Sequence, residues 1–209
     1  EAVGTAPTAL LKGDVTDPDN NGSKSGGAAD PSWNWASINA NNKPAFGADG
    51  AFNVFDNAVG DGNIWCCDDA TAANPLNVTT EFRSGLLLTH FTVTSAGDVS
   101  GAPTKFQILG SNDGTSFTPI YTRDSATPLW TAANQVVRID LQDPAPAYKF
   151  IRYQATETPG ATHQIAEIEY FGKFGGLDNP TIADARVAPY FVQVRVTDGA
   201  DTRLDPATV

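Results

Sequence analysis

The chain has 209 residues, and its 24 acidic side chains outnumber 13 lysines and arginines, which gives a formal net charge of −11. This charge repels nucleic-acid phosphates and anionic membrane surfaces, so the composition argues against nucleic-acid binding and suits divalent cations better. No apolar run approaches the roughly 20 residues that a membrane-spanning helix needs, so we expect no membrane insertion.

Residues Asp14 to Asp30 are polar and rich in turn-forming residues, which predicts a long surface loop. Within it, the stretch DPDNNG begins at Asp17 and has the opening pattern of an EF-hand calcium loop. The twelfth position is Ala28 instead of glutamate, and no flanking helices are evident. We therefore interpret the stretch as a polar loop, and leave open whether Asp17, Asp19 and Asn21 form a second metal site.

Three tryptophans are candidates for ligand contacts. Trp33 and Trp35 are alternate residues, so their rings would point the same way in an extended segment, and Trp130 lies in an expected loop. Aromatic rings bind sugars by stacking on the apolar faces of the sugar rings. The alternative for each is packing against the core.

The only two cysteines, Cys66 and Cys67, are adjacent. They are too few for a disulfide framework or a structural zinc site. A bridge between them would need a strained backbone of the kind that occurs at functional sites, and two buried thiols are the alternative. We favour the bridge because the absence of methionine, the low lysine content and the start at Glu1 favour a mature secreted or cell-surface protein.

Short apolar runs separated by turn residues follow from residue 85 onward, and no long segment has helical periodicity. The run QVVRIDL places Val137, Ile139 and Leu141 on one face, and GSNDG at residues 110–114 is a strong turn signal. The expected strands are residues 85–94, 104–109, 117–122, 135–141, 148–156 and 164–171. Strands at this spacing without helices predict an all-β protein, an antiparallel β-sandwich or jelly roll.

The last 35 residues depart from this pattern. Gly175–Gly176 and the following DNP stretch predict a linker, and Tyr190 to Val196 alternates strictly beyond it. One amphipathic strand cannot bury its apolar face alone. We therefore divide the chain into a sandwich, residues 1–174, and an extension, residues 175–209, whose orphan strand adds to the sandwich, mediates self-association or begins a further domain.

Three stretches occur in an informative order: AFNVFDN leading to DGNIW at residues 51–65, FQILGSNDGTSF at 106–117 and QIAEIEYFG at 164–172. Together they resemble the discoidin or F5/8 type C family, which is galactose-binding-like and includes the family 32 carbohydrate-binding modules. The resemblance spans roughly residues 8 to 174. It implies a jelly-roll sandwich in which Trp65 packs in the core.

The resemblance also implies one structural calcium ion where the first and last stretches meet. Calcium binds six to eight oxygen ligands and mixes carboxylates with carbonyls. Here the loop between Asp56 and Trp65 is longer than the family's. The implied ligands are the carboxylates of Asp56, Asp61 and Glu167, carbonyls near Asn53 and Ala166, and Asn63, which stands where the family has threonine.

Catalysis finds little support, because the chain has no G-x-S-x-G or H-E-x-x-H motif, and neither His90 nor His163 has a recognisable partner. Galactose-binding relatives use an arginine on a loop that corresponds to residues 95–102, where this chain has none. The leading hypothesis is an extracellular module that binds a glycan or another cell-surface or matrix ligand. The alternatives are an assembly subunit of an extracellular filament, surface layer or adhesin, and an accessory domain of a larger secreted hydrolase.

Overall fold

The computed structural model describes residues 9–11, 13–17, 35–60, 63–66, 68–142 and 145–175. The chain divides into a compact unit, Glu1–Phe174, and a second unit, Gly175–Val209. The expected strand Tyr190 to Val196 lies outside the described residues. Within the described residues, no helix has the length and apolar character of a membrane span.

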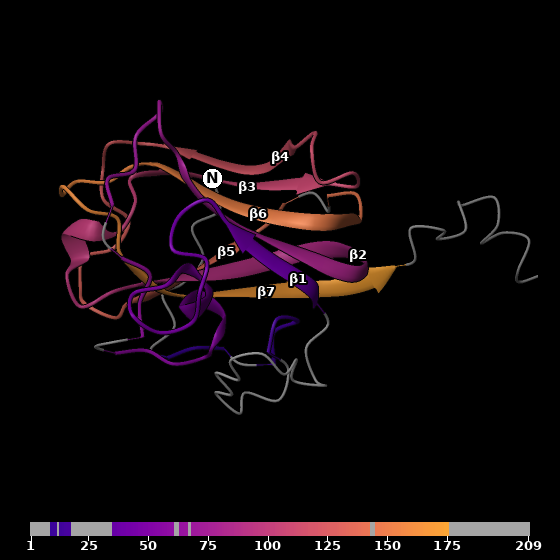
Figure 1. Ribbon diagram of the computed structural model, residues 1–209, viewed down its shortest axis with the longest axis horizontal. Coiled ribbons are helices and arrows are strands. Elements are labelled where there is room, and N and C mark those ends of the chain that lie inside the picture. The colour runs from indigo at the N-terminus through magenta and orange to yellow at the C-terminus, as the bar shows by residue number, and fades with distance from the viewer. Residues whose placement is uncertain are drawn as a thin grey trace, which may run out of the picture. The chain divides into compact units, whose positions relative to one another are not determined.

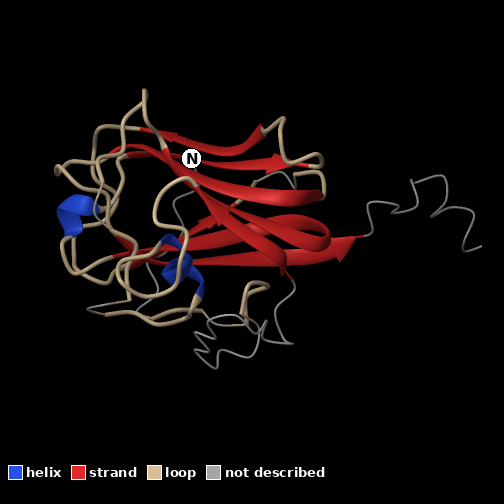
Figure 2. Cartoon of the chain, in the orientation of Figure 1, coloured by secondary structure: helices blue, strands red, loops and turns tan. Residues whose placement is uncertain are grey.

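Seven strands and two short 3-10 helices make up the described fold (Figures 1 and 2). In chain order they are β1 (Trp35–Ala40), η1 (Ala51–Phe55), β2 (Leu76–Ser95), η2 (Val99–Gly101), β3 (Lys105–Ser111), β4 (Thr118–Asp124), β5 (Val136–Asp140), β6 (Tyr148–Glu157) and β7 (Ile165–Gly175). The hydrogen-bonded order is β1-β2-β6-β3-β4, and β5 and β7 also pair with β2. The pairs with a described register are antiparallel.

The long strand β2 joins two layers. Its first part pairs with β1 and β6, its last part pairs with β5, and the register with β6 is irregular between Glu81 and Leu86. Figure 1 shows β4, β3 and β6 as one layer and β2, β5 and β7 as the facing layer. This arrangement is the predicted antiparallel sandwich.

Part of the sandwich core is built from the aromatic rings around Trp65. Trp65 is fully buried and pairs with Ile165 through an isolated β-bridge. Its ring packs edge-on against Tyr153, with 6.2 Å between ring centroids, and against His163, at 4.7 Å. Trp65 therefore belongs to the core as predicted, and His163 is a buried structural histidine.

The N-terminal segment, residues 13–17, packs against the last strand. The backbone N–H of Val15 donates to the carbonyl of Tyr170 at 2.8 Å, and Asp14, Thr16 and Asp17 are each 1% exposed. The prediction of a surface loop beginning at Asp14 is therefore wrong for residues 14–17, because this pairing with β7 removes them from solvent. Residues 18–30 of that loop, with Asp19 and Asn21, lie outside the described residues.

Candidate functional site

Five acidic side chains are buried around the N-terminal segment, η1 and β7, and we call them the acidic cluster. Its members are Asp14, Asp17 and Asp56 (1% exposed each), Glu167 (1%) and Glu169 (0%). Moving an ionised carboxylate out of water is costly unless a cation, a proton or hydrogen bonds offset its charge. The cluster is therefore a candidate cation site.

Burial shifts the pKa of two members of the acidic cluster, Asp14 and Glu167. Burial raises the pKa of Asp14 to about 7. Hydrogen bonds from the Thr16 and Asp17 N–H groups lower this pKa, but their effect is smaller than that of burial. Burial also raises the pKa of Glu167 well above its usual range, and the charges of Asp56 and then Asp14 add to this effect. At neutral pH these carboxyl groups favour either a bound proton or a nearby cation.

Glu167 is bonded through only one of its two carboxylate oxygens. Oε1 of Glu167 accepts from the N–H of Ile168 at 3.1 Å, whereas the buried Oε2 has no hydrogen-bond partner in the structure as described. Asp56 Oδ1 accepts from the N–H of Ala58 at 2.9 Å. The side-chain amide of Asn57 donates to Asp14 Oδ1 at 3.4 Å and thereby links η1 to the N-terminal segment.

The other predicted calcium ligands are Asn53, Ala166, Asn63 and Asp61, and they differ in burial and in hydrogen bonding. The side chain of Asn53 is committed to its own loop, because Oδ1 accepts from Gly47 N at 2.6 Å and Nδ2 donates to the Ile64 carbonyl at 2.9 Å. Ala166 is buried, Asn63 is half-buried, and Asp61 lies outside the described residues.

Among the described residues, no three histidine, cysteine, aspartate or glutamate side chains already surround one metal position. A calcium ion here would therefore also use carbonyl oxygens, as calcium commonly does. The hard oxygen donors and the unpartnered Oε2 of Glu167 fit such an ion.

A second feature is a hollow of about 250 Å³ on the outward face of β3, β4 and β6, which we call the sheet-face hollow. Along β3 the half-buried Lys105 and Gln107 alternate with the buried Phe106 and Ile108, so the first pair faces outward. The lining residues are Lys105, Gln107, Thr122, Arg123, Asp124 and Thr156. The strand register aligns Lys105 with Asp124 and Gln107 with Thr122.

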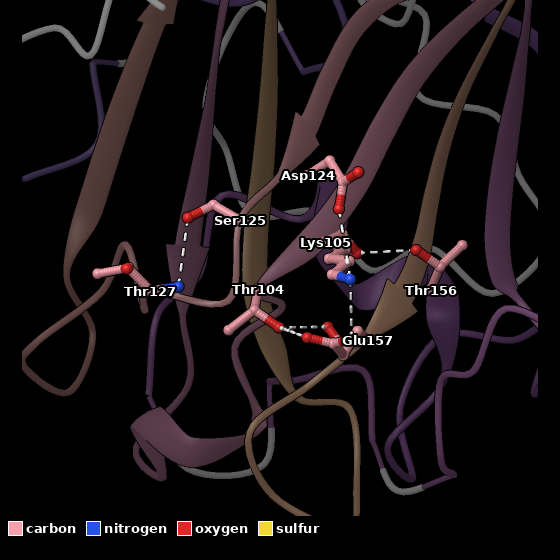
Figure 3. Close-up of polar contacts among 7 residues, drawn as sticks. All are labelled: Thr104, Lys105, Asp124, Ser125, Thr127, Thr156 and Glu157. Carbon is pink, nitrogen blue, oxygen red and sulfur yellow. Dashed lines mark hydrogen bonds and ion pairs between the residues drawn. The ribbon is translucent and has the colours of Figure 1, made fainter.

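Lys105 links the strand ends at this hollow (Figure 3). Its Nζ lies 3.3 Å from Asp124 Oδ1 and 3.2 Å from Glu157 Oε2, and the hydroxyl of Thr104 donates to Glu157 Oε1 at 2.9 Å. Hydrogen bonding to Glu157 and Asp124 raises the pKa of Lys105, so the ammonium stays charged. The Asp124 side chain is 76% exposed, which leaves its carboxylate able to accept bonds from a ligand.

Two of the predicted ligand-binding tryptophans are core residues, and the prediction of an exposed role for them is wrong. Trp35 is 5% exposed, and its ring packs against Phe55 at 5.8 Å. Trp130 is 2% exposed, and its ring N–H donates to the carbonyl of Val93 at 3.1 Å. Neither ring offers a face to a sugar. Trp33 lies outside the described residues.

Cys66 is disulfide-bonded and 3% exposed, and its N–H donates to the carbonyl of Asp49 at 3.1 Å. Cys67 lies outside the described residues, so the vicinal bridge stays a prediction. His90 is half-buried, and its ring stacks on that of Phe171 at 4.5 Å.

Sequence reasoning missed Asp14 and the residues of the sheet-face hollow. The alternation of TKFQIL, with Lys105 and Gln107 between apolar residues, signals an outward polar face. No local signal marks Asp14 as buried, because the residues that cover it are more than forty positions away, at Asn57 and β7.

Comparisons with known proteins agree with this architecture. A model of the F5/8 type C domain matches residues 21–168. Among solved structures, the chain is similar to a chitosan-binding module of a chitosanase/glucanase from Paenibacillus sp. IK-5, with 19% identity and a TM-score of 0.50 over 66% of this chain and 96% of that chain. A family 32 module of NanJ from Clostridium perfringens, in complex with galactose, has 19% identity and a TM-score of 0.50 over 64% and 91%.

A further similar structure is CpGH89CBM32-5 from Clostridium perfringens, in complex with GalNAc-β-1,3-galactose, with 18% identity and a TM-score of 0.50 over 65% of this chain and 94% of that chain. No curated protein matches the chain. At these identities the structural likeness shows the fold, and it confirms the predicted galactose-binding-like sandwich.

Proposed function

Because the chain belongs to the F5/8 type C domain family, we propose that it is a non-catalytic extracellular module that binds glycans and is braced by a structural calcium ion. Similar folds include a chitosan-binding module and modules in complex with galactose and with GalNAc-β-1,3-galactose. The observation that carries the proposal is the sheet-face hollow, where polar side chains gather near the ends of three strands and Thr122 and Asp124 are exposed.

The chemistry of the sheet-face hollow matches that of a sugar. Sugar hydroxyl groups both donate and accept hydrogen bonds, and the hollow offers the acceptor Asp124, the donor Lys105 and the amide of Gln107, which does both. None of the six lining residues is aromatic, so binding would rest on hydrogen bonds without ring stacking. With roughly 1 kcal/mol net from each bond, a few such bonds give a dissociation constant on the order of 1 mM.

The calcium part of the proposal concerns Asp56 and Glu167. These two carboxylates, with carbonyl oxygens near Asn53 and Ala166, would hold the ion. Bound there, the ion would supply the positive charge that offsets the buried acids and would fasten the η1 loop to β7. Its role is structural, because the sheet-face hollow is formed by other strands.

A glycan array with purified protein and added calcium tests sugar binding. The informative variant is Gln107→Ala, and Gln154→Ala is its matched control, because Gln154 pairs with Gln107 on the neighbouring strand but does not line the hollow. We expect wild type and Gln154→Ala to bind the same glycans and Gln107→Ala to lose at least fivefold in affinity. No binding of wild type to any glycan contradicts the function, and equal behaviour of the two variants contradicts the location.

A further inference from the structure

Arg152 of β6 is held in place on the outward face of the sheet. Along β6 the half-buried Arg152, Gln154 and Thr156 alternate with buried residues, so these three side chains face outward. Nε of Arg152 donates to the Thr79 hydroxyl at 2.8 Å, and Cζ of Arg152 lies 3.7 Å from the centroid of the Phe117 ring. These two contacts hold the guanidinium group in one position.

Much of the hydrogen-bonding capacity of this guanidinium group is unused. An arginine offers several N–H donors in one plane, and the Nε donor is the one that bonds to Thr79. The two terminal nitrogens have no hydrogen-bond partner in the described part of the chain, and neither is enclosed, so a ligand can reach them. An aromatic ring against the face of the group leaves these in-plane donors free. The fork that binds a carboxylate through two parallel bonds is therefore available.

Arg152 also differs from other cations of the fold in having no counter-charge. Nζ of Lys149 lies 2.7 Å from Glu81 Oε1, and Nη2 of Arg138 lies 2.6 Å from Asp140 Oδ1. Among the described residues, no carboxylate lies within ion-pair distance of Arg152. Burial lowers the pKa of Arg152, but an arginine stays protonated at neutral pH. A half-buried cation of this kind gains from a ligand that brings a negative charge.

Arg152 lies close to the sheet-face hollow on the same face of the sheet. Gln107, which lines the hollow, is opposite Gln154 in the register of β3 with β6, and Arg152 is two residues before Gln154. Gln107 and Arg152 are therefore diagonal neighbours, about 7–8 Å apart on the sheet surface. One sugar unit can span this distance. A glycan that bonds to Gln107 can thus place a group of its adjacent unit at Arg152.

The net charge of −11 does not exclude an acidic ligand at this position. Exposed charges more than about 8 Å away are largely screened at physiological ionic strength. Glu81, the next outward residue of β2 after Thr79, is paired with Lys149. The local charge that a ligand meets at Arg152 is therefore mainly that of the guanidinium group.

We infer that Arg152 is an anion-binding subsite beside the sheet-face hollow, and that the glycan bound there carries a carboxylate, as an oligosaccharide of uronic acids does. This inference rests on the proposed glycan binding and deepens it by naming the class of ligand. Thr79 and Phe117 are positioning residues, because they hold the guanidinium group. The guanidinium group itself binds the carboxylate through its free N–H groups.

The test measures the affinity of the whole chain for uronic-acid oligosaccharides and for their carboxyl-reduced counterparts, by nitrogen-15 NMR titration at about 0.15 M salt. Each pair of sugars differs only in the charged group, so the ratio of the two affinities isolates the carboxylate. Arg152→Gln removes the charge, and Arg152→Lys keeps the charge but removes the planar fork. Arg138→Gln is the matched control, since it removes one arginine charge from β5 in the facing layer. The same spectra establish that each variant is folded.

We expect wild type and Arg138→Gln to bind a uronic-acid oligosaccharide at least fivefold more tightly than its reduced counterpart. Arg152→Gln should lose this preference, and Arg152→Lys should lower it at least twofold. If wild type binds glycans but prefers no uronic-acid oligosaccharide to its reduced counterpart, or if Arg152→Gln keeps the preference, the inference is wrong and the glycan proposal stands. An unchanged preference in Arg152→Lys would contradict binding through the fork. If wild type binds no glycan at all, both the inference and the glycan proposal are wrong.

Discussion

Acidification should destabilise the protein through His163. The imidazole is fully buried, with Nε2 3.0 Å from the hydroxyl oxygen of Tyr153, and burial lowers its pKa from 6.5 to about 3. The unfolded chain binds a proton near pH 6.5, whereas the folded chain does not until about pH 3. The stabilising effect of the neutral ring is therefore complete above pH 6.5 and is lost as the pH falls.

The magnitude follows from the width of this window. One proton per molecule corresponds to about 1.4 kcal/mol of unfolding free energy per pH unit. Between the two pKa values, 6.5 and about 3, the total loss is about 5 kcal/mol. A loss of this size is a large part of the stability of an ordinary domain.

The assay is urea unfolding followed by tryptophan fluorescence, in constant calcium, at several pH values from about 7 down to about 4. The control variant is His163→Gln, which can still bond to Tyr153 but does not titrate. Subtracting the variant's unfolding free energy from that of wild type cancels the contributions of the carboxyl groups. We expect this difference to fall by about 1.4 kcal/mol per pH unit below pH 6.5. A difference that does not change with pH would refute the argument that His163 is buried and neutral.

Three other predictions concern stability. Trp130→Phe should lower the free energy of unfolding in urea by about 1–3 kcal/mol, because the Val93 carbonyl loses the hydrogen bond from the indole N–H. Its glycan affinity should not change. Normal stability together with lost glycan binding would contradict the core role of Trp130. Gly172→Ala should cost about 1–3 kcal/mol, because the added Cβ would lie 2.1 Å from the Leu87 carbonyl oxygen; an unchanged urea midpoint would contradict this packing. Chelation of calcium should lower Tm by about 5–10 °C in a scanning calorimeter, and an unchanged Tm would count against a structural ion.

The strands from residue 85 onward could be predicted because their side chains alternate and turn residues separate them. The run expected at 135–141 is β5 (Val136–Asp140), and the turn expected at 110–114 overlaps the last two residues of β3. The first half of β2 was missed, although residues 76–82 alternate between buried and half-buried positions, because Asn and Thr interrupt the apolar pattern. β1 has no such alternation: only its end residues Trp35 and Ala40 are buried, and its register shifts after Trp35.

The residues of the candidate sites were harder to predict from the sequence than the strands. The resemblance named Asp56 and Glu167, both of which the fold buries; their role as calcium ligands stays a prediction. The spacing of Trp33 and Trp35 gave no information on burial, because the packing of Trp35 against Phe55 depends on how η1 folds back. The sheet-face hollow depends on the register of β3 with β4, which single-strand patterns do not specify.

The central claim is that the sheet-face hollow binds a glycan. The most direct test is nitrogen-15 chemical-shift mapping with the strongest glycan from the array. We predict that the largest shifts fall on the amides of Lys105, Gln107, Thr122 and Thr156, which line the hollow. Shifts confined to residues that do not line it, such as the loop 96–103, would contradict the claim.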